Sequence, residues 1–93
     1  MTELELLQAV RAAAKSLRIR CCYTGSPVTG FPDLVLIGRA VLFRELENGA
    51  SEVTSVQLEC LTELHIAGHD VAIWRPADWP GRIFAELDAI RPL

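Results

Sequence analysis

The chain has 93 residues, which suits one domain that buries only a little over ~60% of its unfolded surface. Its net charge of −3 gives no overall nucleic-acid footprint, and three cysteines without a CxxC pair argue against a disulfide framework or a structural zinc site. No apolar stretch approaches the ~20 residues of a membrane span, and the acidic start lacks the basic residues of a secretory signal. We therefore expect one domain over residues 1–93, located in the cytoplasm and without a membrane partner.

The first half of the chain predicts one helix followed by three strands. Thr2 and Glu5 have the spacing of a capping box, and apolar residues then recur at helical intervals. A continuous apolar run later indicates a central strand, which a tight turn connects to the next one. The expected elements are a helix at Glu3–Ser16, a strand at 18–24, a loop at 25–30, and strands at Leu34–Ile37 and Val41–Leu46.

The second half predicts a helix, a strand and a final helix. Thr54 and Gln57 form a second capping box, and Gly68 is a natural end for the helix that it opens. The complete order is α-β-β-β-α-β-α, in which a hairpin is joined to a strand that returns through a helix. This order predicts an α/β fold with a mixed four-stranded sheet flanked by helices. The expected elements are a helix at 54–67, a strand at 71–74, a loop at 76–80 and a helix at 81–90.

The length of the turn after Ile37 decides which acidic residues meet across the predicted hairpin. A two-residue turn places Asp33 opposite Arg44 and sends Glu45 to the other face of the sheet. A three-residue turn places Asp33 opposite Glu45 instead. Gly38 favours this second register because glycine tolerates a positive φ in a short turn.

Three acids share one face only in the second register: Asp33, Glu45 and Glu47. Opposed side chains have Cβ atoms about 5 Å apart, and like charges at that distance destabilise a sheet unless a cation bridges them. Oxygen ligands without a neighbouring Cys or His favour Mg²⁺ or Mn²⁺. The alternative is structural, with an aspartate at a loop edge and two glutamates on a solvated strand face. The charge pattern alone favours this alternative.

Four segments change that weighting through their order and spacing. They read Gly-Phe-Pro-Asp-Leu-Val-Leu at 30–36, Phe-Arg-Glu-Leu at 43–46, Thr-Ser-Val-Gln at 54–57 and Val-Ala-Ile-Trp-Arg-Pro-Ala-Asp-Trp at 71–79. With these segments the chain resembles the VRR-NUC family of the PD-(D/E)xK nuclease superfamily, and in particular its small stand-alone members from phages and bacteria. The resemblance covers nearly the whole length, and the predicted order of elements agrees with the restriction-endonuclease-like core of that superfamily.

The resemblance implies a metal-dependent endonuclease that hydrolyses DNA phosphodiesters with Mg²⁺ or Mn²⁺. Stand-alone members are associated with homodimers and with branched, Holliday-junction-like DNA. Carried over by position, Asp33 and Glu45 would bind the metal through their carboxylates and Leu46 through its carbonyl. Gln57 matches a glutamine at the start of the helix that follows. Its role as the N3 partner of Thr54 is an equally good explanation, and the two roles are compatible.

Glu47 departs from the resemblance, because the family usually has lysine there. Three interpretations stay open: Glu47 acts as a base or second-metal ligand, a cation such as Lys15 or Arg44 supplies the missing charge, or catalysis is lost. In the last case the chain is an inactive nuclease-fold module that binds DNA or a protein partner. Glu5 matches an acid that approaches the metal from the first helix, although its capping role is favoured. If the site is active, the resemblance makes the catalytic residues Asp33, Glu45, Glu47 and Gln57.

Contacts with DNA are less well defined by the sequence. Arg11, Lys15 and Arg18 lie toward the end of the first helix, where single cations are typical of ordinary surface charge. The loop at 25–30 comes directly before Asp33 and is the better-placed candidate for holding the substrate.

Overall fold

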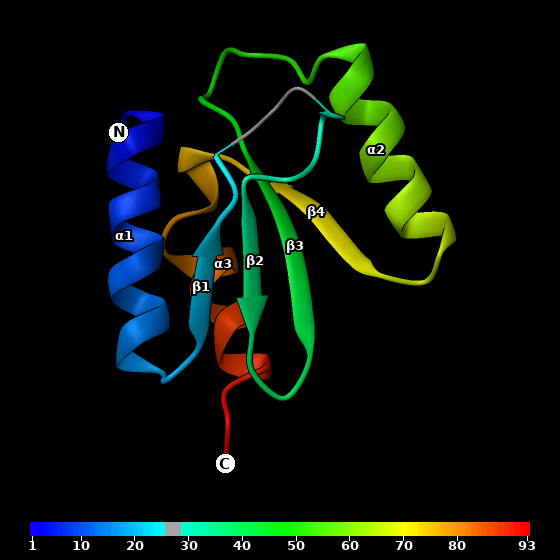
Figure 1. Cartoon of the computed structure of the whole chain (residues 1–93). Helices are drawn as coiled ribbons and strands as arrows, with labels where there is room; N and C mark the ends of the chain where they lie inside the picture. Colours follow the sequence, from blue (N-terminus) through cyan, green and yellow to red (C-terminus); the bar gives the residue numbers. More distant parts are fainter. Residues whose placement is uncertain (26–28) are drawn as a thin grey trace.

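The computed structural model describes residues 1–25 and 29–93 and shows a four-stranded sheet with helices on both faces (Figure 1). The middle of the predicted loop, residues 26–28, lies outside the described residues. The elements are α1 (Glu3–Ser16), β1 (Arg20–Tyr23), β2 (Leu34–Ile37), β3 (Val41–Leu46), α2 (Ser55–Ile66), β4 (Asp70–Trp74), the 3-10 helix η2 (Pro76–Asp78) and α3 (Gly81–Ala89).

The predicted order of elements is confirmed, and the bounds of α1, β2 and β3 agree with the prediction. The other predicted ends differ by at most two residues, and η2 forms inside the predicted loop at 76–80. Strand β1 begins later than predicted because Arg18 takes a φ of 60° as the chain leaves α1. Its N–H donates to the Lys15 carbonyl and the Ile19 N–H donates to the Ala14 carbonyl, so residues 18–19 close the helix rather than extend the strand.

The sheet has the order β1-β2-β3-β4, with antiparallel β1–β2 and β2–β3 pairs and a parallel β3–β4 pair joined through α2. Ile37 pairs with Val41, which confirms the three-residue turn. Gly38 serves this turn for a different reason from the one predicted. Its φ is not among the positive values, but a Cβ there would lie 2.0 Å from the Ile90 carbonyl oxygen. Close approach of the C-terminal segment therefore requires glycine.

The hydrophobic core lies between one face of the sheet and the helices α1 and α3. Helix α2 packs on the other side, against β4, as Figure 1 shows. Within the ranges 1–25 and 29–93, no helix combines the length and apolar character needed to cross a membrane. The fully buried residues at the centre of the core are Leu6, Val10, Ala14, Leu34, Leu36, Trp74, Ile83 and Leu87.

Candidate functional site

Four acidic side chains gather where β2 begins, β3 ends and α1 begins. Asp33 directly precedes β2, Glu45 is the penultimate residue of β3, and Glu47 follows that strand. The confirmed register of the hairpin sets Asp33 beside Glu45. Glu3, the first residue of α1, is the fourth acid, and its negative charge acts on both Glu45 and Glu47. The structure therefore brings together the three acids that the sequence predicted on one face and adds one from α1.

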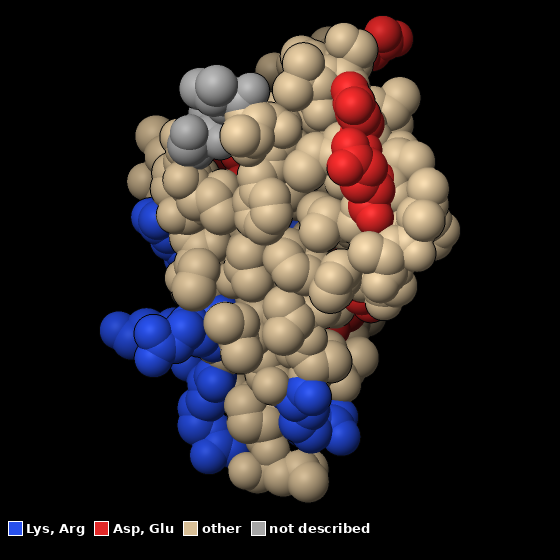
Figure 2. All heavy atoms as spheres, turned by 45° about the vertical axis from the view of Figure 1, so that its right-hand side comes forward, with Lys and Arg blue, Asp and Glu red and all other residues tan. Residues whose placement is uncertain are grey.

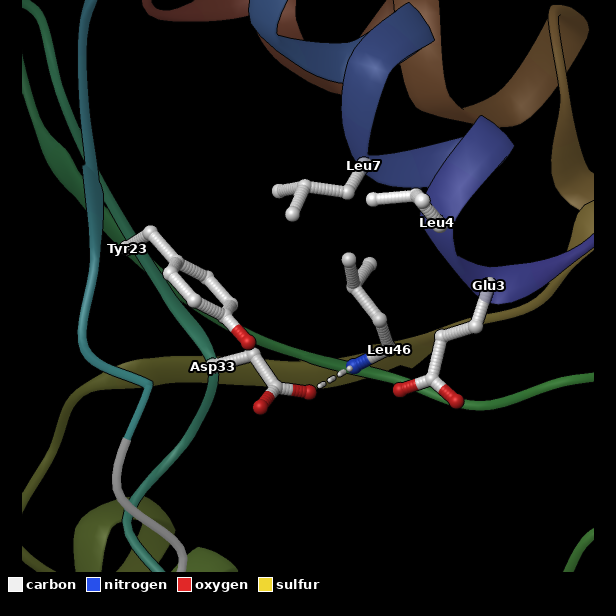
Figure 3. A pocket seen from close by; sticks show the side chains of 6 residues that line it. All are labelled: Glu3, Leu4, Leu7, Tyr23, Asp33 and Leu46. Atoms are coloured by element: carbon white, nitrogen blue, oxygen red, sulfur yellow. Dashed lines mark hydrogen bonds between the residues drawn. The ribbon is translucent and has the colours of Figure 1, made fainter.

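The backbone of β3 fixes the carboxylate of Asp33. The Leu46 N–H donates to Asp33 Oδ2 at 3.0 Å (Figure 3). The Glu47 N–H donates in the opposite direction, to the Trp74 carbonyl at 3.1 Å. Because the C=O and N–H of a trans peptide point opposite ways, the Leu46 carbonyl is directed toward the side of β3 on which Asp33 lies. The predicted ligand atoms of Asp33 and Leu46 therefore lie on the same side of β3.

Glu45 is the most perturbed acid of the site. Its side chain is 1% exposed, and Oε2 has no hydrogen-bond partner among the described residues. Burial, then hydrogen bonding with Asp33, and then the like charges of Asp33, Glu47 and Glu3 raise the pKa of Glu45 to about 9. Buried polar atoms normally find a partner, so the unpaired oxygen calls for an explanation. A bound cation would provide one, because it favours the charged carboxylate and accepts the free oxygen as a ligand.

Glu47 is also buried, with 7% of its surface exposed. Burial and the charge of Glu3 raise its pKa, whereas the charge of Arg75 lowers it. Arg75 is held in place because its Nη1 donates to two carbonyls of the loop after β3, at 2.9 Å for Asn48 and 2.7 Å for Ser51. Arg75 is thus the positive charge that acts on Glu47.

Neither cation that the sequence suggested as a substitute for the family's lysine lies at the site. Arg44 is 3% exposed and faces the core, where its Nη2 pairs with Glu86 at 2.9 Å and with Asp70 at 3.0 Å. Lys15 lies in the last turn of α1, about 18 Å along the helix from its first residue. The sequence analysis missed Arg75, although it directly follows β4, and the parallel β3–β4 pairing brings that end of β4 beside the end of β3.

Helix α1 contributes Glu3 to the site rather than Glu5. The Thr2 N–H donates to Glu5 Oε1 at 2.8 Å and the Glu5 N–H donates to Thr2 Oγ1 at 3.1 Å, which confirms the capping role of Glu5. Glu3 comes one turn before the buried Leu7, so helical spacing places it toward the sheet. Burial and the charge of Asp33 raise the pKa of Glu3. This spacing was a readable signal in the sequence.

Gln57 takes its predicted structural role at the start of α2. The Thr54 N–H donates to Gln57 Oε1 at 2.8 Å and the Gln57 N–H donates to Thr54 Oγ1 at 3.2 Å. The same turn packs against Gly30, which has a φ of +74° and where a Cβ would lie 2.4 Å from the Val56 carbonyl oxygen. The segment that leads to Asp33 thus rests on the start of α2. A catalytic role for Gln57 stays a prediction.

A pocket of about 170 Å³ opens beside the acids (Figure 3). Leu4, Leu7 and the ring of Tyr23 form its apolar wall, and the carboxylates of Glu3 and Asp33 lie at its acidic end. Apolar walls next to converging carboxylates strengthen electrostatic interactions, because they displace water from around the charges. The remaining lining residue is Leu46.

The oxygen donors of the site fit a hard divalent cation. Across residues 1–25 and 29–93, no three His, Cys, Asp or Glu side chains form a ready-made set of metal ligands. Two carboxylates and one carbonyl, from Asp33, Glu45 and Leu46, supply three oxygens without a third side chain. Mg²⁺ commonly binds through one or two carboxylates and keeps several waters, so this donor set suits it. The buried and unpaired Oε2 of Glu45 is the observation that supports the fit.

Comparison with known proteins bears on the fold. No protein-family model matches the sequence, and no curated relative does so either. A solved structure described as a VRR_NUC domain protein matches with a TM-score of 0.70 and 20% identity, over 99% of this chain and 92% of that chain. This chain has the fold of a VRR_NUC domain protein. The predicted resemblance to VRR-NUC is thereby confirmed for the architecture, including the mixed four-stranded sheet with its three α-helices.

Proposed function

We propose that this chain is a metal-dependent DNA endonuclease of the VRR-NUC type. The observation that carries the proposal is the buried acid pair of Asp33 and Glu45, with an unpaired carboxylate oxygen, in a fold shared with a VRR_NUC domain protein. Asp33 and Glu45 would hold Mg²⁺ or Mn²⁺ through their carboxylates, and Leu46 through its carbonyl. When bound, the cation supplies Lewis-acid activation of water and neutralises charge on the phosphate.

The residues around the acid pair have separate tasks in this proposal. The Leu46 N–H holds Asp33 in position, at 3.0 Å from Oδ2. Glu47 accepts the proton of the attacking water at its carboxylate, and burial raises its pKa toward the range that suits a general base. Arg75, whose charge acts on Glu47, provides positive charge near the phosphate where the family usually has lysine. Gln57, at the start of α2, orients the water or the phosphate from the side.

For the substrate we propose branched, Holliday-junction-like DNA, and for the working form a homodimer. Two copies related by a two-fold axis present two identical sites, which suits cutting of two strands at a junction. The small size of the chain supports this form, because a domain of 93 residues gains stability from an interface.

The competing candidate is an inactive module that keeps the fold and binds DNA or a protein partner. The observation in its favour is Glu47, whose negative charge adds to the three other acids of the site where the family usually has lysine. An excess of negative charge without the lysine repels the phosphate unless the metal and Arg75 compensate for it.

Cleavage of a synthetic four-way DNA junction with Mn²⁺ or Mg²⁺ separates the two candidates. The chain is compared with its Asp33→Ala and Glu47→Lys variants. Cutting by the unmodified chain that Asp33→Ala abolishes supports the endonuclease with a glutamate-type site. Cutting only after Glu47→Lys supports an intact scaffold that one residue keeps inactive. Absence of cutting by all three proteins overturns the proposed activity in favour of the binding module.

A further inference from the structure

A cationic groove lies between the end of α1 and strand β1, away from the acids. It is hollowed to about 530 Å³, and no acid is among its lining residues. Its four cations come from the last turns of α1, the connection after it and the start of β1, and all are exposed. We call this feature the α1–β1 groove. Its lining residues are Arg11, Lys15, Arg18, Ile19, Arg20 and Cys21.

The groove gathers cations that have no carboxylate partner among the described residues. The chain has nine Lys and Arg residues, and four of them line the groove. Within the described residues none of these four forms an ion pair, although Arg11 stacks over the Tyr23 ring at 5.4 Å and Arg18 Nη2 donates to the Pro92 carbonyl at 3.5 Å. The other five are already engaged with carboxylates or with backbone carbonyls: Arg39, Arg44, Arg75, Arg82 and Arg91. Four cations without a carboxylate partner among the described residues therefore lie together in this groove.

Acidic and basic side chains are segregated on the surface. In Figure 2 a row of Asp and Glu follows the side on which α2 has come forward, while Lys and Arg gather at the lower end of the molecule. Helix α2 carries Glu59 and Glu63, which are one helical turn apart. The net charge of −3 averages over these regions, so it hides a local surplus of positive charge.

The groove and the acid site lie on one continuous strip. Glu3 and Leu7 of α1 line the acidic pocket, while Arg11 and Lys15 line the groove, so the strip follows residues spaced by one turn of the same helix. Tyr23 joins the two parts, because its ring lines the acidic pocket and also stacks with Arg11. Twelve residues of helix between Glu3 and Lys15 correspond to about 18 Å. That length equals the axial rise of about five nucleotides in one strand of a DNA duplex.

We propose that the α1–β1 groove binds the phosphate backbone of a DNA strand and directs that strand into the acid site about five nucleotides away. Arg11 and Lys15 lie one turn apart on α1, and Arg18 follows in the connection after it, so the three cations fit a repeating negative charge better than a single anion. Arginine suits phosphate contacts because its guanidinium donates two parallel hydrogen bonds. The inference rests on the proposed function only in placing the cleaved phosphate at the acids, and binding by the groove itself needs no metal.

The test measures DNA binding without metal and hence without cleavage. Fluorescence anisotropy in EDTA follows a labelled duplex of about 20 base pairs over a range of salt concentrations. The proteins are the unmodified chain, a double variant with Arg11→Gln and Lys15→Gln, and the control Arg82→Gln. Glutamine keeps helix propensity, and both groove residues are exposed, so the double variant retains the fold, which circular dichroism verifies. Arg82 lies outside the groove and is paired with Glu86 at 2.7 Å.

The slope of log affinity against log salt concentration is negative, and loss of two phosphate contacts reduces its magnitude by about 1.8. We expect this decrease for the double variant, together with weaker binding, and an unchanged slope for Arg82→Gln. Equal slopes for all three proteins, or failure of the unmodified chain to bind DNA, would overturn the inference. It would equally be overturned if polyglutamate, but not DNA, lost affinity for the double variant, because the partner would then be an acidic protein.

The same experiment keeps this inference separate from the proposed activity. If the chain fails to cut the junction but the salt slope falls in the double variant, the nuclease proposal is wrong and the groove stands. If the chain cuts the junction and the slope does not change, the nuclease proposal stands and the groove is wrong.

Discussion

Replacement of Glu45 by glutamine keeps the shape of the side chain but removes its titratable proton. In the folded protein the pKa of Glu45 is about 9, whereas its ordinary value of 4.5 applies to the unfolded chain. At neutral pH the folded state therefore keeps a proton that the unfolded state has released. The contribution of this proton to the free energy of unfolding is fully present below pH 4.5 and is lost as the pH rises toward 9. The amide of glutamine needs no proton, so this dependence disappears in the variant.

One proton gives a slope of about 1.4 kcal/mol per pH unit in the free energy of unfolding. At pH 7 the free energy of unfolding of the wild-type protein is therefore about 3 kcal/mol lower than it is below pH 4.5. A domain of this size has a total stability of roughly 5–14 kcal/mol, so the loss is a large fraction of it. The buried amide adds a cost of about 1–3 kcal/mol that does not depend on pH, so the slope is the quantity to compare.

Urea unfolding of both proteins in EDTA, from about pH 5 to pH 8, measures the two slopes. We expect the wild-type free energy of unfolding to fall by about 1.4 kcal/mol per pH unit more than that of Glu45→Gln. Glu3 and Glu47 also have raised pKa values, but they are present in both proteins, so the difference reports Glu45. Parallel pH profiles would refute the reasoning. Added Mn²⁺ should restore the stability of the wild type at the higher pH but not that of the variant.

Three further substitutions test other parts of the structure. Glu47→Ala should abolish metal-dependent cleavage of a DNA junction in a gel assay, and unchanged cleavage would exclude Glu47 as base or ligand. Gly38→Ala should lower the free energy of unfolding in urea by about 1–3 kcal/mol, because its Cβ would lie 2.0 Å from the Ile90 carbonyl oxygen. Gly81→Ala meets open space and serves as its control, so an equal loss in both would contradict this explanation. Arg44→Ala removes a buried side chain whose charged hydrogen bonds reach two partly exposed carboxylates and should cost about 1–3 kcal/mol by thermal unfolding, whereas unchanged stability would show that the network is not needed.

The elements were predictable because their signals are local. Two capping boxes mark the starts of α1 and α2, and the hydrogen bonds of Thr2 and Thr54 confirm both. The number of residues between Ile37 and Val41 sets the register, and strand alternation then fixes which acids share a face. Of the two registers that the sequence left open, the structure has the one that places Asp33 beside Glu45.

The parts that sequence reasoning missed depend on contacts between distant segments. Arg75 reaches the surroundings of Glu47 because β4 lies parallel to β3, and the partners of Arg75 are carbonyls more than twenty residues away. The need for glycine at position 38 comes from the carbonyl of Ile90, near the other end of the chain. Glu3 was readable from helical spacing, but the resemblance pointed to Glu5, which caps the helix instead. Local sequence patterns carry no information about contacts between residues that are far apart in the chain.

Binding of Mn²⁺ measured by isothermal titration calorimetry tests the metal site most directly. The chain is compared with Asp33→Asn at about pH 7, in buffers of different ionisation enthalpy, so that released protons are counted along with affinity. The account predicts that the unmodified chain binds Mn²⁺ and releases about one proton, because Glu45, with its pKa of about 9, must ionise to become a ligand. Asp33→Asn should weaken binding by at least about tenfold. Absence of Mn²⁺ binding by the unmodified chain, or equal binding by Asp33→Asn without proton release, would contradict the metal site.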